Sequence, residues 1–534
     1  MPGGWRPTLL YPLLFAAAPV LYIAGRSAGQ YRTSDLAIVL SAVVLAAALP
    51  LAAGVAIGRT FDPSGRAGPL AAACAMLLVA WCFYYLPARE AIASEARPLG
   101  SHRVLVPLGL LVTGAALVWL FRQPRERLLG LSAFMTRFGL VLVALTAFGV
   151  VTAGSRAPRA VRHSDLVRAL AAPIPSADAL PPSNRPARDI YLLVLDGHAN
   201  ARVLSEVFGF DNSRFEDSLR SLGFVVPPDV RSNYVQTYLS VSSLLNASHV
   251  TALAQDAGVT SRDHSLPTYL VRRNRTARFL KAHGYRYVLF PSAWWAATSS
   301  SPLADQEFDA EPGLDLRHEL RRTELRTAVV RSTPFRPLVD GDRGMVPMVT
   351  QILRSFAGLR AIADDPASTF TFAHVLLPHV PYLVDAECRP LAHPVPDDME
   401  ADTPEQRADY IGQVHCVDRL VLELVTSLLR RSSPAPIILV VGDHGSRFAD
   451  VGFYAHPERV SPAFIRERFG AFGAFYLPAG GDSVFREPVT LVNVVGNVLR
   501  YYFAADLAPS PDEMYVSGID LYRFYRVDPG LLRP

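Results

Sequence analysis

The stretch Ile190–His198 (IYLLVLDGH) places six apolar residues directly before an acid, a glycine and a histidine. A continuous apolar run of this length is typical of a strand that is buried on both faces, as in a parallel sheet. A second run, Ile437–Val441 (IILVV), leads into the tetrapeptide GDHG at 442–445 in the same way. The glycines allow tight turns and close approach of a ligand. The two stretches predict an α/β domain that carries chemistry at the carboxyl ends of its strands.

Other segments of the same part of the chain alternate between strand and helix patterns. We expect further strands at Tyr285–Phe290, Phe370–Leu377 and Phe472–Leu477. We expect helices at Asn212–Leu222 and Tyr410–Arg431. Strands that alternate with helices indicate a parallel or mixed sheet with helices on both faces. The predicted fold class of this part is therefore α/β.

The front of the chain is much more apolar than the rest. Of the 534 residues, 50% are apolar and 19% are charged, and mean hydropathy is +0.21, whereas soluble proteins carry about 25% charged residues. This composition argues against a wholly soluble enzyme and against disorder. Five apolar runs approach the ~20 residues that a membrane-crossing helix needs. They are Leu9–Ala24, Leu36–Gly58, Pro69–Leu86, Val104–Phe121 and Phe138–Gly154.

These patterns predict three parts: a transmembrane domain of about five helices over 1–154, a juxtamembrane linker over 155–187, and a catalytic domain over 188–534. The linker is rich in Pro, Ala and Arg and ends with Pro181, Pro182 and Pro186. With the N-terminus inside, six arginines flank the spans inside and eight outside, so the positive-inside rule does not orient the chain. No span has a central acid, which argues against an ion pathway, and a net charge of +4 gives no reason to expect a nucleic-acid partner.

Two acids and a histidine follow the two buried strands. Asp196 comes after the first strand, and Asp443 and His444 come after the second. Carboxylates together with imidazole are a common ligand set for zinc or manganese. A strand-end aspartate also often caps the following helix, and for Asp196 both interpretations stay open.

Thr237 stands in the segment QTYLS (236–240), where an apolar helix ending near Asn246 begins. A hydroxyl at such a position is commonly a helix N-cap. A helix N-terminus also attracts anions, because its free N–H groups and its dipole both favour negative charge. Beside a metal, the pKa of the hydroxyl would fall, and Thr237 would become a nucleophile.

The segment LPHVPY (377–382) follows another apolar run, and its prolines expose His379. His379 is a candidate acid, base or hydrogen-bond donor to a transferred anionic group, and an ordinary surface or core histidine is the alternative. We expect His374, within the run itself, to be packed. The pair Trp294 and Trp295 suits lipid headgroups, a sugar or core packing equally well.

Four cysteines are too few for a disulfide scaffold. Cys388 and Cys416 are candidates for one disulfide if their part of the chain faces an oxidising compartment, and two buried thiols are the alternative. Cys74 and Cys82 lie in an apolar run, which predicts that they are small buried residues of the core.

Four stretches, in their order along the chain, resemble the alkaline-phosphatase superfamily: YLLVLDGH (191–198), RSNYVQTYLSVSSLLN (231–246), FAHVLLPHVPY (372–382) and VVGDHGSR (440–447). The branch they resemble is that of the sulfatase-like membrane proteins, which includes lipoteichoic acid synthases and lipid A phosphoethanolamine transferases. The resemblance implies an alkaline-phosphatase-like mixed sheet flanked by helices, in a multi-pass protein of the plasma or inner membrane whose catalytic domain is extracytoplasmic.

The resemblance also implies roles for the candidate residues. Asp196, Thr237, Asp443 and His444 would hold one divalent metal ion (Zn, Mn, Mg or Ca), with Thr237 also the nucleophile, and His379 would contact the transferred group. Thr237 would attack the phosphorus or sulfur of an ester in a membrane lipid or envelope glycan. A covalent Thr237 ester would form, and water or an acceptor hydroxyl would then take the group.

The chain departs from the sulfatase pattern at the nucleophile. At the nucleophile, sulfatases carry the motif Cys/Ser-x-Pro-x-Arg, whose first residue matures to formylglycine. In this chain the corresponding segment 237–241 reads TYLSV. Ligands for a second metal are not evident, because His456 and Asp385 match no motif well, so we expect one metal. The alternatives are a sulfuric ester hydrolase and, from a different class, a catalytically degenerate sulfatase-like binding module.

Overall fold

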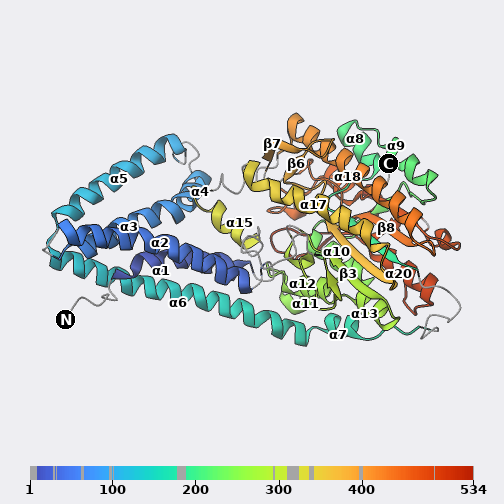
Figure 1. The fold of residues 1–534 in the computed structure, drawn as a ribbon, viewed down its shortest axis with the longest axis horizontal. Coiled ribbons are helices and arrows are strands. Elements are labelled where there is room, and N and C mark those ends of the chain that lie inside the picture. The colour runs from blue at the N-terminus through green and yellow to red at the C-terminus, as the bar shows by residue number, and fades with distance from the viewer. Residues whose placement is uncertain are drawn as a thin grey trace. The chain divides into compact units, whose positions relative to one another are not determined.

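The computed structural model describes residues 9–27, 31, 33–61, 65–95, 99, 101–176, 188–292, 295–308, 324–335, 342–395, 401–450, 452–485 and 487–532. The chain divides into two compact units (Figure 1). The helical unit comprises residues 1–156 and 319–339, and the α/β unit comprises 157–318 and 340–534. Trp294 and the three prolines Pro181, Pro182 and Pro186 lie outside the described residues.

The helical unit consists of helices of widely different length. Its described elements are α1 (Tyr11–Arg26), α2 (Thr33–Phe61), α3 (Ala67–Phe83), α4 (Tyr85–Glu95), α5 (His102–Arg122), most of α6 (Arg125–His163) and α15 (Glu324–Arg331). Each of the five predicted apolar runs overlaps one of them. Among the described residues, three helices are long and apolar enough to cross a membrane, over Thr33–Gly58, His102–Arg122 and Arg125–His163. The remaining two runs form the shorter helices α1 and α3, of 16 and 17 residues.

The outer surface of the longer helices is apolar. Leu111 on α5 is 72% exposed and Phe148 on α6 is 67% exposed, and neighbouring leucines and valines are similarly open. Such a surface would be unfavourable in water, whereas it suits contact with lipid chains. Helices α2 and α3 instead pack closely through small residues, because a Cβ at Gly58 would lie only 2.7 Å from the Cβ of Ala67.

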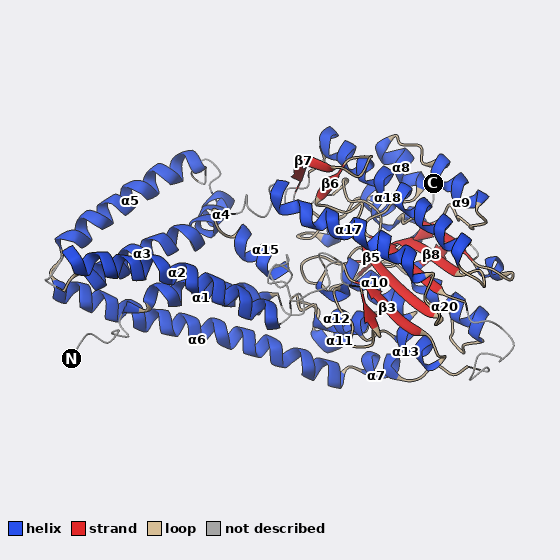
Figure 2. Ribbon diagram, in the orientation of Figure 1, coloured by secondary structure: helices blue, strands red, loops and turns tan. Residues whose placement is uncertain are grey.

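The α/β unit is built on a six-stranded sheet, the largest among its described residues, with the order β4-β3-β5-β1-β8-β9 (Figure 2). The strands are β1 (Ile190–Leu195), β3 (Arg286–Phe290), β4 (Gln306–Glu307), β5 (Thr369–Val375), β8 (Ile437–Gly442) and β9 (Gly473–Tyr476). All neighbouring pairs are parallel except β8 and β9, which are antiparallel. The predicted α/β class with a mixed sheet is confirmed.

Helices cover both faces of this sheet, as the alternation of side chains along β1 shows. Leu192 and Val194 join a core cluster with one set of helices, while Leu193 and Leu195 join a second cluster on the opposite face. The first set is α10 (Thr237–Asn246), α13 (Arg275–Ala282) and α20 (Leu491–Phe503), and the second is α9 (Ser213–Ser221), α17 (Asp342–Ile362) and α18 (Pro404–Arg431). Burial on both faces explains why β1 is apolar throughout.

Shorter elements complete the α/β unit. The helices are α7 (Asp165–Ala171), α8 (Ala201–Phe208), α11 (Leu253–Ala257), α12 (Ser265–Arg272) and α19 (Pro462–Phe469). Three two-stranded pairs combine β2 (Val230–Arg231) with β10 (Val489–Thr490), β6 (Tyr382–Val384) with β7 (Pro390–Val395), and β11 (Tyr515–Val516) with β12 (Tyr525–Arg526).

The predicted elements agree with the structure to within two residues at most of their ends. The exception is the helix predicted to begin at Tyr410, which begins six residues earlier, at Pro404. Thr403 caps this end by accepting a hydrogen bond from the backbone N–H of Gln406, at 3.2 Å. The Thr-Pro-Glu sequence at 403–405 is a helix-start signal that the apolar pattern alone does not reveal, because the first turn of α18 is polar.

A disulfide joins Cys388 and Cys416, whose Cα atoms are 5.1 Å apart. Cys388 lies in the turn between β6 and β7, and Cys416 lies within α18. The bond therefore fastens the β6–β7 hairpin to the helix behind the sheet. Of the two alternatives for Cys388 and Cys416, the structure therefore shows the disulfide. Among the described residues, Cys74 and Cys82 are free and partly buried.

Replacing both Cys388 and Cys416 with serine should lower the stability of the α/β unit. Closing a loop across 28 residues of sequence removes chain entropy from the unfolded state that is worth about 3–4 kcal/mol. Thermal unfolding of the purified chain, with and without reductant, measures the loss. The control is the Cys74→Ser/Cys82→Ser variant, which should respond to reductant as the wild type does. Equal midpoints for the double Cys388/Cys416 variant and the wild type would contradict the expectation.

Candidate metal and nucleophile site

The candidate site forms where β1 and β8 end side by side. The two strands are parallel and in register, with Leu195 opposite Gly442. The next residues along the chain are Asp196 and Asp443, so the sheet itself brings the two carboxylates together. The side chains of Asp196, Asp443 and His444 are fully buried.

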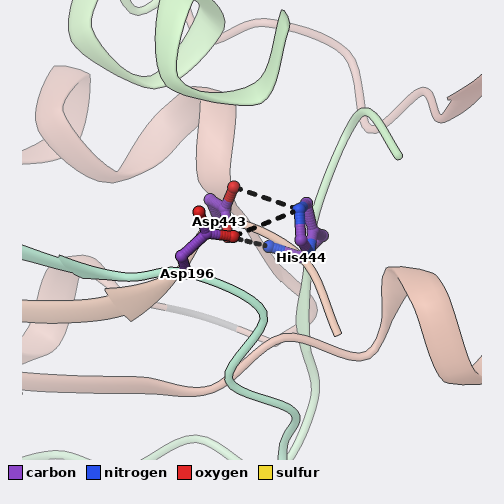
Figure 3. Close-up of side chains that lie close together, drawn as sticks. All are labelled: Asp196, Asp443 and His444. Atoms are coloured by element: carbon purple, nitrogen blue, oxygen red, sulfur yellow. Dashed lines mark hydrogen bonds and ion pairs between the residues drawn. The ribbon is translucent and has the colours of Figure 1, made fainter. Parts of the chain in front are cut away.

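The three side chains converge on one small region (Figure 3). The Nε2 atom of His444 lies 3.2 Å from Oδ2 of Asp443 and 3.6 Å from Oδ1 of Asp196. One potential ligand atom from each residue falls within 4.8 Å of the other two. The other oxygen of Asp443, Oδ1, accepts hydrogen bonds from the backbone N–H groups of Gly197 and His444, at 2.9 and 3.0 Å. The glycine turn after β1 therefore helps to fix the Asp443 carboxylate.

Hydrogen bonds determine the tautomer of His444. Its Nε2 lies 2.9 Å from Nη2 of Arg468, and a guanidinium can only donate. Nε2 must therefore be the unprotonated nitrogen, and Nδ1 carries the proton, which it donates to the carbonyl oxygen of Gly445 at 3.0 Å. Burial and the nearby guanidinium hold the pKa of His444 well below its usual range, which keeps the ring neutral.

In this tautomer Oδ1 of Asp196, Oδ2 of Asp443 and Nε2 of His444 face one another, and Nε2 also accepts from Nη2 of Arg468. Oδ1 of Asp196 and Oδ2 of Asp443 are buried and have no hydrogen-bond partner among the described residues. Nε2 of His444 cannot donate to either of them. Buried carboxylate oxygens without partners are unfavourable, and a divalent cation is the partner that two carboxylates and a neutral imidazole suit. The donor set therefore fits a metal ion.

The pKa values of the two acids move in opposite directions. Burial and the charge of Asp196 raise the pKa of Asp443 to about 7. Burial also acts to raise the pKa of Asp196, but His379, His374 and His444 around it hold that pKa below its usual range. Two carboxylates that share a buried site repel each other, so one retains its proton more strongly unless a cation is present.

Thr237 is the first residue of α10, and its hydroxyl oxygen lies 3.1 Å from Nε2 of His444. The helix N-cap is Gln236, whose side chain instead donates to Ser517 and Gly518. The cap interpretation of Thr237 is therefore wrong, because its hydroxyl belongs to the Asp196–Asp443–His444 cluster. The start of α10 also brings the positive end of a helix dipole to Thr237.

Arg468 is a buried cation that the sequence analysis missed. It lies in α19 and is 1% exposed. Besides its bond to His444, it donates to the carbonyl oxygens of Val235 and Gly445, at 2.7 and 2.9 Å through Nη2 and Nη1. It thereby ties the chain before Thr237 to the chain after His444. The RERF segment around it carries only a polar helix pattern, so nothing in the sequence singles it out.

Other buried polar groups hold the loop that follows β8. Ser232 and Ser240 each donate a hydroxyl hydrogen bond to the carbonyl oxygen of Asp443, at 2.7 and 2.6 Å. Glu467, 1% exposed, accepts bonds from the Ser446 hydroxyl and from the backbone N–H groups of Phe448 and Ala449. Ser446 thus serves to hold the loop rather than to extend the cluster.

His379 lies beside the cluster and is partly buried, with its ring centre 6.0 Å from that of His444. Its backbone N–H donates to the carbonyl oxygen of Asp196 at 2.9 Å, which anchors this loop to the end of β1. Its Nδ1 donates to the carbonyl oxygen of Val380, so Nε2 is the nitrogen left for a ligand. A pocket lies against it, lined also by Gly197, Ser446 and Arg468.

Two residues that the sequence assigned elsewhere contact Asp196. The indole N–H of Trp295 donates to Oδ2 of Asp196, and Nε2 of His374 lies 3.5 Å from the same oxygen. His374 is packed within β5, as expected, but it also faces the site. The candidate extra ligands lie outside the cluster: Asp385 pairs with Arg389, and the largely exposed His456 lies 3.6 Å from Glu458.

Comparisons with known proteins give no match to a family model and none to a curated protein. Several solved structures are similar. The zinc complex of the C-terminal periplasmic domain of EptC from Escherichia coli is 12% identical, with 65% of this chain and 94% of that chain covered and a TM-score of 0.41. The integral membrane lipooligosaccharide phosphoethanolamine transferase A from Neisseria meningitidis is 13% identical, with 94% and 96% covered and a TM-score of 0.39. Phosphonate monoester hydrolase of Agrobacterium radiobacter is 11% identical, with 61% and 75% covered and a TM-score of 0.37.

Asp443→Asn should abolish tight binding of a divalent cation, because it removes one of the two charged oxygen donors. We expect a loss larger than the roughly 10–100-fold that follows removal of an outer partner of a metal ligand. Titration calorimetry of the purified, chelator-treated chain with Zn²⁺ or Mn²⁺ measures it. The matched control is Asp385→Asn, which removes a carboxylate outside the cluster and should bind as the wild type does. Equal affinities for both variants would contradict a metal centre at Asp443.

Proposed function

We propose that this chain is a membrane-anchored, metal-dependent transferase or hydrolase of phospho-groups, acting on a lipid or cell-envelope substrate through Thr237. One observation carries the proposal: the Thr237 hydroxyl, at the start of α10, lies 3.1 Å from the unprotonated Nε2 of His444. It therefore borders the group of buried donors that lack partners among the described residues. A nucleophilic hydroxyl, a cation site and a helix N-terminus together suit transfer of an anionic group.

Asp196, Asp443, His444 and Thr237 would hold the cation, which would lower the pKa of the Thr237 hydroxyl and offset negative charge on the transferred oxygens. Thr237 Oγ1 gives up its hydroxyl proton and attacks phosphorus, and its bond to phosphorus forms as the bond to the leaving oxygen breaks on the opposite side. The departing alkoxide takes up a proton from solvent and leaves as the alcohol. The product is a Thr237 phosphoester. Water or an acceptor hydroxyl then attacks this ester and releases Thr237.

Three positive or polar features would assist the transferred group. Arg468 brings a permanent positive charge to the edge of the site, so that with a divalent cation the positive charges outweigh the two carboxylates. The positive end of the α10 dipole lies at Thr237. His379, with Nδ1 engaged by Val380, offers Nε2 as a hydrogen-bond donor when protonated. A net positive, buried site favours a phospho-group that carries one or two negative charges.

The residue type at position 237 favours phosphorus over sulfate chemistry. Sulfate ester hydrolysis through formylglycine requires a cysteine or serine that can be oxidised to an aldehyde, and Thr237 is neither. A threonine hydroxyl can act directly as a nucleophile on phosphorus. We therefore place phospho-group transfer ahead of sulfate hydrolysis.

The helical unit and the disulfide support a location in a membrane. Helices α2, α5 and α6 are long and apolar enough to anchor the chain in a bilayer. The Cys388–Cys416 bond favours an oxidising compartment, which for a membrane protein lies outside the cytoplasm. We propose that the α/β unit faces that side and that its substrate is a lipid or glycan of the envelope.

Incubation of the purified chain with membrane lipids and a divalent cation should give a covalent adduct on Thr237. Trypsin releases this residue within the peptide 232–262, and fragmentation assigns the adduct to one of its hydroxyl residues. The added mass identifies the group as phosphate, phosphoglycerol, phosphoethanolamine or sulfate. We expect the adduct in the wild type, less of it in Thr237→Ser, and none in Thr237→Ala.

The matched control is Ser248→Ala, which removes another hydroxyl from the same peptide and should leave the adduct in place. An adduct that persists in Thr237→Ala, or that maps to a different residue, would rule out Thr237 as the nucleophile. An adduct mass equal to sulfate would favour the sulfuric ester alternative instead.

A cysteine at Ser205 and a cysteine at Glu126 should face opposite sides of the membrane. Both positions are exposed, the first on α8 and the second in the first turn of α6. In a Cys74→Ser/Cys82→Ser background, an impermeant thiol reagent should label Ser205→Cys in intact cells and Glu126→Cys only after permeabilisation. The reverse pattern would place the α/β unit in the cytoplasm.

A further inference from the structure

The two oxygens of Asp196 are in very different surroundings. Oδ2 accepts the indole N–H of Trp295 and faces Nε2 of His374 at 3.5 Å. Oδ1 is buried without a hydrogen-bond partner among the described residues and faces His444. Oδ2 of Asp196 is thus held by Trp295, whereas Oδ1 faces the cluster of Asp443 and His444.

The proton on His374 is placed by Thr298. The Thr298 hydroxyl lies 2.9 Å from Nδ1 of His374, much closer to a good hydrogen bond than its 3.4 Å contact with the carbonyl oxygen of Trp295. When the hydroxyl donates to Nδ1, the ring proton resides on Nε2. That proton then sits on the nitrogen that lies 3.5 Å from Oδ2 of Asp196, an electrostatic contact longer than a good hydrogen bond. His374 and Thr298 are 3% and 1% exposed, so bulk water does not reach these bonds.

Trp295 and Thr298 come from one loop, which follows the end of β3 and contains the short 3-10 helix Ala296–Thr298. The backbone N–H of Thr298 donates to the carbonyl oxygen of Trp295 at 3.2 Å, which closes the turn. The indole ring packs edge-on against Tyr238, with ring centres 5.4 Å apart. Tyr238 directly follows Thr237, so the loop is fixed to the start of α10 as well.

We propose that Trp295 and His374 are positioning residues that clamp Oδ2 of Asp196, so that Oδ1 alone is presented to the cation site. The inference rests on the proposed metal centre and adds which oxygen of Asp196 serves it and what holds that oxygen. Residues that orient a metal ligand through its other hydrogen-bonding atom commonly set metal affinity. Neither residue touches the reacting atoms in this assignment.

Zn²⁺ titration of the full-length chain in detergent tests the clamp. We expect Trp295→Phe and His374→Leu each to weaken Zn²⁺ binding about 10–100-fold, the usual effect of losing an outer partner. His374→Gln, whose side-chain N–H can reach the position of Nε2–H, should restore most of the affinity. Trp119→Phe, at an exposed indole on α5, is the matched control and should bind as the wild type does.

Fluorescence supplies a readout that a merely structural role would not change. Because its N–H bonds to Asp196, the indole of Trp295 should change its emission when Zn²⁺ binds, and Trp295→Phe should lose this change while Trp119→Phe keeps it. Thermal unfolding without metal checks that the variants are folded. If His374→Leu does not fold, Trp295→Phe and His374→Gln decide the question.

The outcomes separate the clamp from the metal centre. Unchanged Zn²⁺ affinity and unchanged fluorescence response in Trp295→Phe, with binding lost in Asp443→Asn, would overturn the clamp and leave the metal centre standing. Failure of the wild type to bind Zn²⁺, or equal binding by Asp443→Asn, would overturn the metal centre and the clamp with it. Weaker Zn²⁺ binding by Trp295→Phe and His374→Leu, with most of the affinity retained in His374→Gln, supports both the clamp and the metal centre.

Discussion

The structure of the α/β unit depends on placing two carboxylates side by side in a fully buried position. Parallel pairing of β1 with β8 makes this unavoidable, because both strands end in register and an aspartate follows each. Two buried like charges destabilise a fold unless the surroundings compensate for them. Much of the nearby polar architecture does so: backbone N–H groups for Asp443, the indole of Trp295 for Asp196, and Arg468 beside His444. Within the described part of the chain, what remains uncompensated is one oxygen on each acid.

This uncompensated charge connects fold to function. The described packing around the strand ends provides partners for the outer atoms of both acids and none for the atoms that face inward, which is the reverse of what stability alone would favour. The helix that begins at Thr237 and the loop that carries His379 are held by bonds to the same strand ends. The chemistry that we propose uses the point where the described hydrogen bonding is incomplete.

The sequence predicted those parts of the site that depend on regular structure. Asp196, Asp443 and His444 could be located because the end of an apolar run marks the end of a buried strand. A parallel sheet then brings the carboxyl ends of its strands together. Thr237 and His379 followed from a helix start and a proline-flanked turn. Trp295, His374 and Arg468 could not be assigned in this way. Their roles arise from contacts between elements that are distant in sequence, 99 residues apart for Trp295 and Asp196, and whose own patterns are those of a loop, a buried strand and a polar helix.

The path of the chain between the two units has a practical consequence. Residues 319–339 interrupt the sequence of the α/β unit and belong to the helical unit, where Leu325 and Val329 of α15 are buried against Val20, Ala24 and Val39 of α1 and α2. Cutting the chain after α6 would therefore not yield a clean soluble fragment. The cut would remove the helices that bury α15 and would expose its apolar face to water. A soluble α/β fragment should therefore replace residues 319–339 with a short polar loop.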